Sequence, residues 1–485
     1  MLERLGTEDL VVTRPDADPA VSGVASDSRM VTRGDLFCAW GGTHYDSHDF
    51  VPAAASAGAV AALVERPVGA AVPQVVVRDG RTAAALAADE VAGRPAETMV
   101  LAGVTGTNGK TTTVWILRHL LSARWSAASL GTVGAVLEGG VPLPGTESLT
   151  TPGPVGMAST MAAFRDHNTE AVAMEVSSHA LDQSRVHALR FSAVVFTNLT
   201  RDHLDYHGTL DDYRLAKWEL MTLLRPDGVA ALNADDPAWD GLEERAPRVL
   251  RYGLESGRGG ADVVARDVRM HAAGADFVLD SPDGRAEVRL PLLGAYNVQN
   301  ALGAAAACLG LGLDLEEVVD GLASAPQIPG RLEQVAERPC RVVTDYAHTP
   351  DALERVLSTL KAVAVGRVVV VFGAGGDRDP GKRPLMGEVA SRLADVVVVT
   401  SDNPRTEDPD AIIDGIMAGV DRADALRVTD RREAIHRALA LAEPADVVVL
   451  AGKGHETYQV LGTETVPFDE RAIVREWMER EGAAE

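Results

Sequence analysis

The chain has 485 residues, of which 46% are hydrophobic and 24% are charged, a composition typical of a globular protein and not of a disordered or fibrous one. At about 150 residues per domain, this length predicts roughly three domains. Seventy acidic residues against 46 basic ones give a net charge of −24. Such a field repels polyanions, so the charge argues against nucleic-acid binding.

The cysteines and the N-terminal segment bear on the compartment. Cys38, Cys308 and Cys340 are too few and too widely spaced for a disulfide framework or a paired metal site. We therefore expect a reducing compartment, the cytoplasm. The first ten residues carry four charges where a secretory signal would be apolar, and no stretch is apolar and long enough to span a bilayer. The sequence predicts neither export nor membrane insertion.

Lysine is rare in this chain. Only five of the 46 basic residues are lysine, namely Lys110, Lys217, Lys361, Lys382 and Lys453. Where charge alone is needed the chain uses arginine, so lysine marks positions that require a compact ammonium or an amine able to lose its proton. Chance retention in an arginine-rich composition is the alternative. Lys110 and Lys453 fall within the motifs described below, and Lys217 is a further candidate residue.

Turn-prone segments near residues 93–96 and 326–330 divide the chain into three predicted domains, 1–97, 98–328 and 329–485. In the second and third, short β-branched runs end in polar or glycine-rich loops and alternate with helical stretches, which is typical of a parallel sheet covered on both faces. We expect an α/β fold, whose ligands bind at the carboxyl ends of the strands. The predicted strands are Met99–Val104, Ala171–Met174, Ala193–Phe196, Val368–Phe372, Val396–Val399 and Val447–Leu450, and a helix is predicted from Val298 to Leu311.

The loop after the first of these strands, residues 103–112, reads Gly-Val-Thr-Gly-Thr-Asn-Gly-Lys-Thr-Thr. Small residues let backbone N–H groups approach phosphate oxygens, Lys110 can reach the terminal phosphates, and Thr111 can ligate Mg²⁺. A glycine-rich turn that binds nothing is the alternative, since Val104 replaces the first glycine of the general pattern. We predict a nucleoside triphosphate site at Gly106, Thr107, Asn108, Gly109, Lys110, Thr111 and Thr112.

Carboxylates and histidines follow the next two predicted strands. Glu175 follows the first, and Asp202, His203, Asp205 and His207 follow the second. Hard oxygen ligands beside a triphosphate predict Mg²⁺. The two histidines have zinc-pair spacing, but Leu204 stands where a zinc protease needs its glutamate, which disfavours zinc. A plain solvated surface is the remaining alternative.

A set of ordered motifs resembles a known family. The segments are residues 27–29, 34–37, 106–112, 150–152, 175–179, 197–207, 330–333, 345–350, 375–379, 402–405 and 452–456. Together they resemble the Mur ligases, the ATP-dependent amino-acid ligases of peptidoglycan synthesis. The set is most similar to the branch of that family that adds the third residue of the stem peptide to UDP-MurNAc-L-Ala-D-Glu.

The resemblance implies an N-terminal domain for the UDP end of the substrate, a central ATP-binding P-loop domain and a C-terminal Rossmann-like domain for the amino acid. Phosphoryl transfer converts a carboxylate to an acyl phosphate, which an amine then attacks. The implied cofactors are ATP and Mg²⁺, and the implied catalytic groups are Lys110, Glu175, His203 and Lys217. Thr111, Glu175, His203 and a carboxylated Lys217 are the implied metal ligands. An ordinary surface lysine in a helix is the alternative for Lys217.

The resemblance also implies contacts with both nucleotides. Asn300, near Asn297, resembles the adenine side of the ATP site, while Arg331 and Asp345 resemble its phosphate and ribose contacts. Helix capping is the alternative for the two asparagines. The residues that resemble the UDP-substrate site are Ser28, Thr43, His44, Tyr45, Thr150, Thr151, Ser177, Gln183 and Arg185.

The implied amino-acid pocket favours diaminopimelate. This substrate has a second amino-acid head, whose carboxylate suits Arg405 and whose ammonium suits Glu456. Lysine lacks that carboxylate. A structural ion pair is the alternative for Arg405. The residues assigned to this pocket are Arg378, Asp402, Asn403, Pro404, Arg405, Gly452 and Glu456.

Other functions remain as alternatives: the same chemistry with L-lysine or in a secondary-metabolite pathway, a ligase similar to folylpolyglutamate synthase, or a nucleotide-binding regulator without turnover. We expect a monomer that acts on the two small substrates, UDP-MurNAc-L-Ala-D-Glu and diaminopimelate. Because the implied ATP contacts fall in two predicted domains, we expect hinge motion near Gly330.

Overall fold

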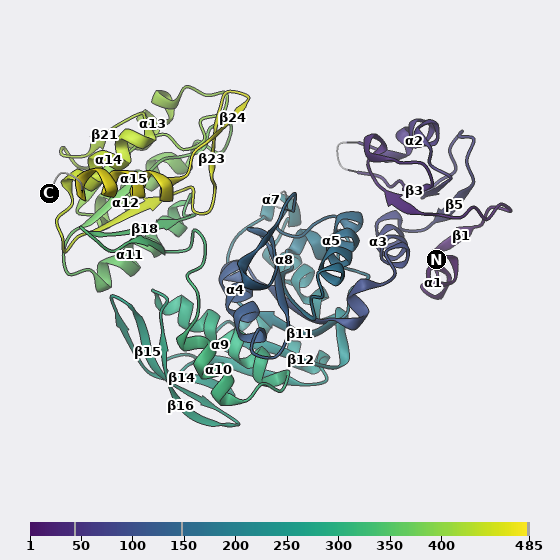
Figure 1. Ribbon diagram of the computed structural model, residues 1–485, viewed down its shortest axis with the longest axis horizontal. Coiled ribbons are helices and arrows are strands. Elements are labelled where there is room, and N and C mark those ends of the chain that lie inside the picture. Colours follow the sequence, from purple (N-terminus) through teal and green to yellow (C-terminus); the bar gives the residue numbers. More distant parts are fainter. Residues whose placement is uncertain (43–44, 147–148, 483–485) are drawn as a thin grey trace. The chain divides into compact units, whose positions relative to one another are not determined.

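The computed structural model describes residues 1–42, 45–146 and 149–482 (Figure 1) and consists of two compact units. The first unit comprises Met1–Arg266, Val278–Ala286 and Gln299–Leu322. The second comprises Asp267–Phe277, Glu287–Val298 and Ala323–Glu485. The division into domains 1–97, 98–328 and 329–485 stays a prediction.

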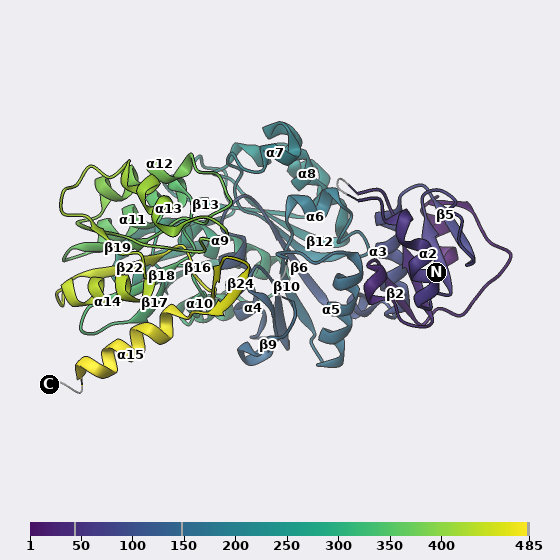
Figure 2. The same ribbon diagram turned by 90° about the horizontal axis from the view of Figure 1, so that it is seen from above.

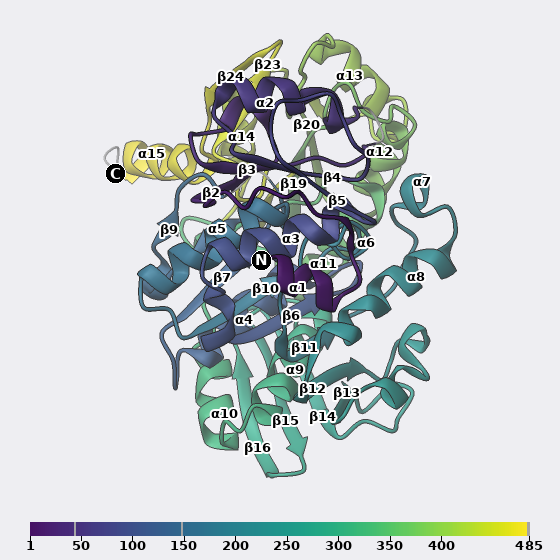
Figure 3. The same ribbon diagram turned by 90° about the vertical axis from the view of Figure 1, so that its right-hand side faces the viewer.

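The first unit begins with a small five-stranded sheet of order β1-β5-β4-β3-β2. Its strands are short because turns and 3-10 segments interrupt the chain, and only β1 runs antiparallel to its neighbour. Helix α3 packs against α5 of the following segment (Figure 3). The elements are α1 Leu2–Thr7, β1 Val11–Thr13, β2 Gly23–Ala25, β3 Asp35–Cys38, α2 Val51–Ala57, β4 Ala61–Val64, β5 Gln74–Val77 and α3 Gly80–Val91.

A larger sheet follows in the first unit, with strand order β13-β12-β11-β6-β10-β7-β8-β9. The strands from β13 to β7 are parallel, and β8 and β9 turn back antiparallel. The elements up to α6 are β6 Val100–Thr105, α4 Lys110–Leu121, β7 Ala127–Gly131, β8 Gly134–Val136, β9 Pro142–Leu143, α5 Pro154–Asp166, β10 Ala171–Glu175 and α6 Ser178–Asp182. Those that follow are β11 Phe191–Phe196, α7 Leu204–His207, α8 Leu210–Trp218, β12 Leu224–Asn233 and β13 Val249–Leu254.

The segment after β13 is divided between the two units. It contains β14 Val263–His271, β15 Gly274–Ser281, β16 Gly284–Leu290, α9 Ala295–Gly310 and α10 Leu315–Ala323. The alternating exposure along β14 and β16 is typical of strands with one face in water. These three strands were not predicted from the sequence.

The second unit contains a six-stranded sheet of order β17-β18-β22-β19-β20-β21, with only β17 antiparallel. Helix α15 lies beside α14 (Figure 2). The elements up to α13 are β17 Glu333–Ala336, β18 Arg341–Asp345, α11 Pro350–Val363, β19 Val368–Phe372, α12 Lys382–Leu393, β20 Val396–Val399 and α13 Pro409–Met417. Those that follow are β21 Leu426–Arg427, α14 Arg431–Leu441, β22 Val447–Ala451, β23 Tyr458–Leu461, β24 Glu464–Pro467 and α15 Glu470–Gly482.

The α/β prediction is confirmed in both units. All six predicted strands form, as β6, β10, β11, β19, β20 and β22, with ends shifted by no more than about two residues, and the predicted helix is α9. Strands β19 and β22 are buried along their whole length, which explains their uninterrupted apolar sequence. Across the described ranges, no helix combines the length and the apolar character needed to cross a membrane.

Candidate active site

The loop between β6 and α4 has the backbone geometry of a phosphate-binding turn. Gly106 has φ +148° and Gly109 has φ +84°, conformations that favour glycine. A Cβ at Gly106 would lie 1.9 Å from Thr197 Oγ1, and one at Gly109 would lie 2.3 Å from Asn300 Oδ1. Helix α4 then begins at Lys110, so the N–H groups of its first turn point toward the loop.

The loop after β11 holds the phosphate loop in place. The amides of Thr107 and Asn108 donate to the backbone and side-chain oxygens of Asn198, at 2.7 and 3.0 Å. Thr197 Oγ1 donates in return to the Asn108 carbonyl at 2.7 Å. These two amides are therefore engaged by protein oxygens. Thr111 and Thr112 follow in the first turn and are buried.

Two lysines converge on one carbonyl of this loop. Lys110 Nζ donates to the carbonyls of Gly106 and Thr107, at 3.0 and 2.8 Å. Lys217, on α8, donates to the same Gly106 carbonyl at 2.8 Å and lies over the Tyr213 ring, 4.4 Å from its centroid. The Lys217 side chain is only 1% exposed. Burial lowers the pKa of its amine well below the ordinary lysine value, and Lys110 lowers it further.

Glu175 ends β10, next to β6, and is 1% exposed. Its carboxylate accepts from the amide of Thr132 at 2.8 Å and from the Thr132 hydroxyl at 3.2 Å. A Cβ at Gly131 would lie 2.3 Å from Glu175 Oε1, so glycine is required there for the carboxylate to fit. Thr132 was not among the residues predicted from the sequence, and its only signal was its place directly after a strand of the sheet.

His203 lies in an aromatic cluster and not on Glu175. Its ring contacts that of His179, with centroids 4.8 Å apart, and that of Tyr213 at 6.0 Å. His207 Nε2 lies 3.0 Å from the Ser178 hydroxyl. Within residues 1–42, 45–146 and 149–482, no hydrogen bond joins His203 to Glu175 and no group of three or more His, Cys, Asp or Glu side chains forms a metal cluster.

A polar band connects most of the residues predicted for the UDP-linked substrate. Thr151 Oγ1 donates to the Glu175 carbonyl at 2.9 Å and accepts from the Ser177 amide. Arg185 donates to the Thr151 carbonyl at 2.9 Å and to Gln183 Oε1 at 2.7 Å. Burial lowers the pKa of the Arg185 guanidinium, a cost that favours an anionic partner.

The other predicted substrate residues lie elsewhere in the first unit. Thr150 Oγ1 contacts Thr132 Oγ1 at 3.2 Å, close to the band. Ser28 begins a 3-10 turn capped by Asp27, and Tyr45 is 77% exposed. Neither has a hydrogen bond to the band among the described residues. Thr43 and His44 lie outside the described residues.

The predicted nucleotide residues of the second unit surround a short aromatic stack. Tyr346 lies between His348 and His455, with ring centroids 4.7 and 5.4 Å apart, and the Arg331 guanidinium lies over its ring. Asp345 accepts from the amides of Leu332 and Ala347, both at 2.8 Å. Burial raises the pKa of the Asp345 carboxyl, and Arg331 opposes this.

The two candidate adenine-side asparagines are both buried on α9. Asn297 donates to the Leu293 carbonyl at 2.7 Å. Asn300 lies against Gly109 of the phosphate loop. Of the two, Asn300 is therefore the one positioned beside the predicted phosphate site, within the first unit.

The predicted amino-acid residues lie together in the second unit. Asn403 Nδ2 donates to Glu456 Oε2 at 3.0 Å. Arg405, with φ +52°, donates to the Gly376 carbonyl at 2.7 Å. Its guanidinium and the Arg378 side chain both lie near Gly375. Arg405 thus has no carboxylate partner among the described residues, which argues against the structural ion-pair alternative.

The loops that carry this cluster also fit closely against each other. Gly452 has φ +120°, and a Cβ there would lie 2.4 Å from Asp402 Oδ2. That Asp402 oxygen is buried and has no hydrogen-bond partner among the described residues. The Pro404 carbonyl accepts from the Glu407 amide and would lie 1.9 Å from a Cβ at Gly376. Glycines therefore set the spacing of these loops.

A buried ion pair holds the strand ends that carry the predicted amino-acid residues. Arg431, which begins α14, is 1% exposed, and Glu470 of α15 is equally buried. Arg431 Nε donates to Glu470 Oε1 at 2.7 Å. The same guanidinium donates to the carbonyls of Ser401 and Ala451, which follow β20 and end β22. One side chain therefore fixes the ends of the two strands whose loops hold Asn403 and Glu456.

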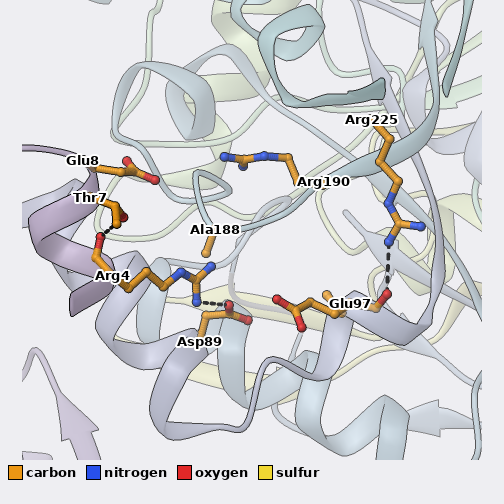
Figure 4. Close-up of a pocket in the computed structure, with 9 residues that line it drawn as sticks. Arg4, Thr7, Glu8, Asp89, Glu97, Ala188, Arg190 and Arg225 are labelled. Atoms are coloured by element: carbon orange, nitrogen blue, oxygen red, sulfur yellow. Dashed lines mark hydrogen bonds and ion pairs between the residues drawn. The ribbon is translucent and has the colours of Figure 1, made fainter. Parts of the chain in front are cut away.

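A cavity of about 580 Å³ lies at the amino-terminal ends of strands β6, β11 and β12 of the large sheet (Figure 4). Arg190 and Arg225 line it together with the ion pair Arg4–Asp89, whose closest atoms are 2.6 Å apart. None of the predicted site residues lines this cavity. The residues predicted from the loops of this sheet follow the carboxyl ends of its strands, whereas the cavity lies at the amino-terminal ends.

The fold and these motifs define an α/β protein with a glycine-rich loop at the carboxyl end of a parallel sheet, the class in which P-loop enzymes are found. The sequence profile of the Mur ligase middle domain matches residues 104–308, and that of the Mur ligase glutamate ligase domain matches residues 330–454. The chain belongs to the Mur ligase family.

Several relatives that share one enzyme name are similar to the chain over nearly its whole length. The chain is 45% identical to a UDP-N-acetylmuramoyl-L-alanyl-D-glutamate–2,6-diaminopimelate ligase of Geobacillus kaustophilus, over 96% of each protein. It is 42% identical to the ligase of the same name from Synechococcus elongatus, over 94% of each. A solved structure of a ligase with this name is 35% identical, has a TM-score of 0.72 and covers 95% of both chains.

Proposed function

We propose that the protein uses ATP to join diaminopimelate to the D-glutamyl carboxylate of UDP-MurNAc-L-Ala-D-Glu, a step of peptidoglycan precursor synthesis. The observation that carries this proposal is the 45% identity over 96% of the chain to a diaminopimelate ligase. The reaction forms a C–N bond and releases ADP and phosphate.

A carboxylate is a poor electrophile, so the reaction requires an acyl phosphate, which the amine of diaminopimelate attacks with loss of phosphate. We assign charge neutralisation at the transferred phosphoryl group to Lys110. Its ammonium is held at the mouth of the phosphate loop by the carbonyls of Gly106 and Thr107. Thr107, Asn108 and Thr112 shape the loop, and the first turn of α4 supplies the N–H donors.

The donor set in the first unit suits Mg²⁺. Glu175 and Thr111 supply hard oxygens, and His203 supplies an imidazole with an exposed ring. The amine of Lys217 has a lowered pKa and is therefore suited to react with CO₂ and form an anionic carbamate. Bound magnesium would neutralise negative charge on the phosphates.

The second unit supplies the remaining contacts. We assign Arg331 and Asp345 to the nucleotide, with Asn300 of the first unit, and the cluster around Arg405 and Glu456 to diaminopimelate. The guanidinium of Arg405 suits the distal carboxylate, and the carboxylate of Glu456 suits the distal ammonium. Arg378, Asp402, Asn403, Pro404 and Gly452 complete this pocket.

The polar band around Arg185 suits the muramoyl dipeptide, because the partly buried guanidinium of Arg185 favours an anionic ligand. We assign Thr150, Thr151, Ser177 and Gln183 to the same part of the substrate, and Ser28 and Tyr45 to the uridine end. We expect the enzyme to act in the cytoplasm as a monomer. Its three cysteines are free and buried, which suits a reducing compartment.

A competition panel tests the proposal. Purified protein is incubated with ATP, Mg²⁺ and UDP-MurNAc-L-Ala-D-Glu, and meso-diaminopimelate, LL-diaminopimelate, L-lysine or L-ornithine is added. We expect phosphate release and a tripeptide product only with a diaminopimelate, and neither product with Lys110→Ala. Ligation of lysine at an equal rate would contradict the assigned specificity. Unchanged ligation by Lys110→Ala would contradict the mechanism.

A further inference from the structure

One buried lysine in the second unit has no role in the function proposed above. Lys453 lies in the loop after β22, and its side chain is 0% exposed. Its Nζ donates to Asn403 Oδ1 at 2.9 Å and to Glu456 Oε2 at 3.3 Å. It therefore contacts two of the residues assigned to the amino-acid substrate, without belonging to that assignment.

The contacts of Lys453 fix the side-chain amide of Asn403. Asn403 Oδ1 accepts from Lys453 Nζ and from the amide of Val460, at 2.9 and 3.0 Å. Its Nδ2 donates to Glu456 Oε2. In the opposite orientation of the amide, an NH₂ group would face an ammonium and an N–H, and none of these groups can accept a hydrogen bond. The cation thus determines which end of Asn403 faces the carboxylate.

The same ammonium orients Glu456. Both hydrogen bonds to this carboxylate within the described residues, from Asn403 and from Lys453, end on Oε2. Oε1 accepts none of the hydrogen bonds found in the described part of the chain. A carboxylate held through one oxygen presents the other in a fixed direction, as a substrate ammonium requires.

A lysine is costly at this position. Desolvation lowers the pKa of Lys453, while Asp402 and Glu456 act in the opposite direction. A chain that otherwise uses arginine for positive charge keeps a compact ammonium here. We propose that Lys453 is a positioning residue for the amino-acid substrate, holding Asn403 and Glu456 so that Glu456 Oε1 is presented to the distal ammonium of diaminopimelate.

This inference rests on the proposed function, so the wild-type reaction with diaminopimelate is measured first. If the wild type does not ligate diaminopimelate, the proposed function fails. If it does, the Lys453 variants test the inference alone. Lys453→Met keeps the length of the side chain and removes the ammonium, and Lys361→Met is the matched control. Lys361 is in the same unit, exposed, and paired with Asp395.

For Lys453→Met we expect the KM for diaminopimelate to rise about 10- to 100-fold, the usual effect of losing hydrogen bonds to charged groups. The KM values for ATP and for UDP-MurNAc-L-Ala-D-Glu should stay within about twofold. Lys361→Met should leave all three unchanged. Equal changes in all three KM values, or an unchanged KM for diaminopimelate, would overturn the inference.

A second variant covers the case in which Lys453→Met does not fold. Lys453→Gln keeps a hydrogen-bond donor without the charge, and the inference predicts a KM for diaminopimelate raised about tenfold. In a Glu456→Gln background the Lys453→Gln change should add less than about twofold, because its effect passes through Glu456. Additive effects of the two substitutions would show that Lys453 acts independently, and would overturn the inference.

Discussion

The ion pair between Arg431 and Glu470 gives the clearest quantitative prediction. Replacing Glu470 by Ala removes the carboxylate that accepts from Arg431 Nε at 2.7 Å and leaves a guanidinium at a position that is 1% exposed. Two hydrogen bonds to the carbonyls of Ser401 and Ala451 remain. No other carboxylate of the described part of the second unit then lies within ion-pair distance of the guanidinium.

Breaking a buried ion pair by removing one partner costs about 3–5 kcal/mol. The carboxylates of Asp402 and Glu456 also raise the pKa of Arg431, so part of the charge stays compensated. We therefore expect the lower end of that range, about 3 kcal/mol. At 2–4 °C per kcal/mol for a unit of about 150–250 residues, the Tm of the second unit should fall by about 6–12 °C.

Differential scanning calorimetry of the full chain measures this shift. The matched control is the double variant Arg431→Met/Glu470→Leu, which replaces the pair with apolar side chains and should lose clearly less stability than the single variant. A Tm for Glu470→Ala within about 2 °C of the wild type would refute the reasoning. So would a double variant as unstable as the single one, because the loss would then come from packing.

Three further predictions follow from the geometry of the sites. Lys217→Met should lower turnover at least about 100-fold, measured as phosphate release, because the amine at the phosphate loop is lost. The Tm measured by calorimetry should stay the same or rise, because a buried amine no longer has to be desolvated. Gly131→Ala places a Cβ 2.3 Å from Glu175 Oε1 and should lower turnover about tenfold or more, whereas Gly69→Ala, with nothing within 4 Å, should leave it unchanged. Burial lowers the pKa of His455 to about 4 in the folded protein, against about 6.5 in the unfolded chain. As the pH falls, the unfolded state therefore gains the proton first. The free energy of unfolding should decrease as the pH falls from about 6.5 toward about 4. Denaturant titrations should show that His455→Phe removes about 2 kcal/mol of the destabilisation between pH 7 and pH 5.

Each of these three predictions has its own refuting result. Wild-type turnover in Lys217→Met would exclude Lys217 from the chemistry. Equal activity of Gly131→Ala and Gly69→Ala would show that Glu175 need not keep its observed position. A pH dependence of stability in His455→Phe that matches the wild type would assign that dependence to other titrating groups.

The strands that position the site could be predicted because their sequences are unambiguous. The β-branched runs of β19, β20 and β22 can only be buried on both faces, and their chain positions matched the observed strands. The phosphate loop could be predicted for a similar reason, since its glycines at 106 and 109 adopt positive φ. In these segments the local sequence and the fold specify the same conformation.

Other features depend on contacts that a sequence does not display. Thr132 binds Glu175 only because β7 and β10 are neighbours in the sheet, although they are far apart in the chain. The pair Arg431–Glu470 joins two helices whose surface-like sequences give no sign of a buried charge. The strands β14 to β16 were missed because their half-exposed pattern resembles loop sequence. Such long-range contacts require the assembled fold.

The scarcity of lysine has a practical consequence for handling this protein. Lys217 and Lys453 are almost completely buried, and Lys110 and Lys382 donate to backbone carbonyls while only partly exposed. Lys361, with a side chain 46% exposed, is the one lysine on the open surface. An amine-acylating dye or tether should therefore attach mainly there and at the amino terminus, without any engineered cysteine.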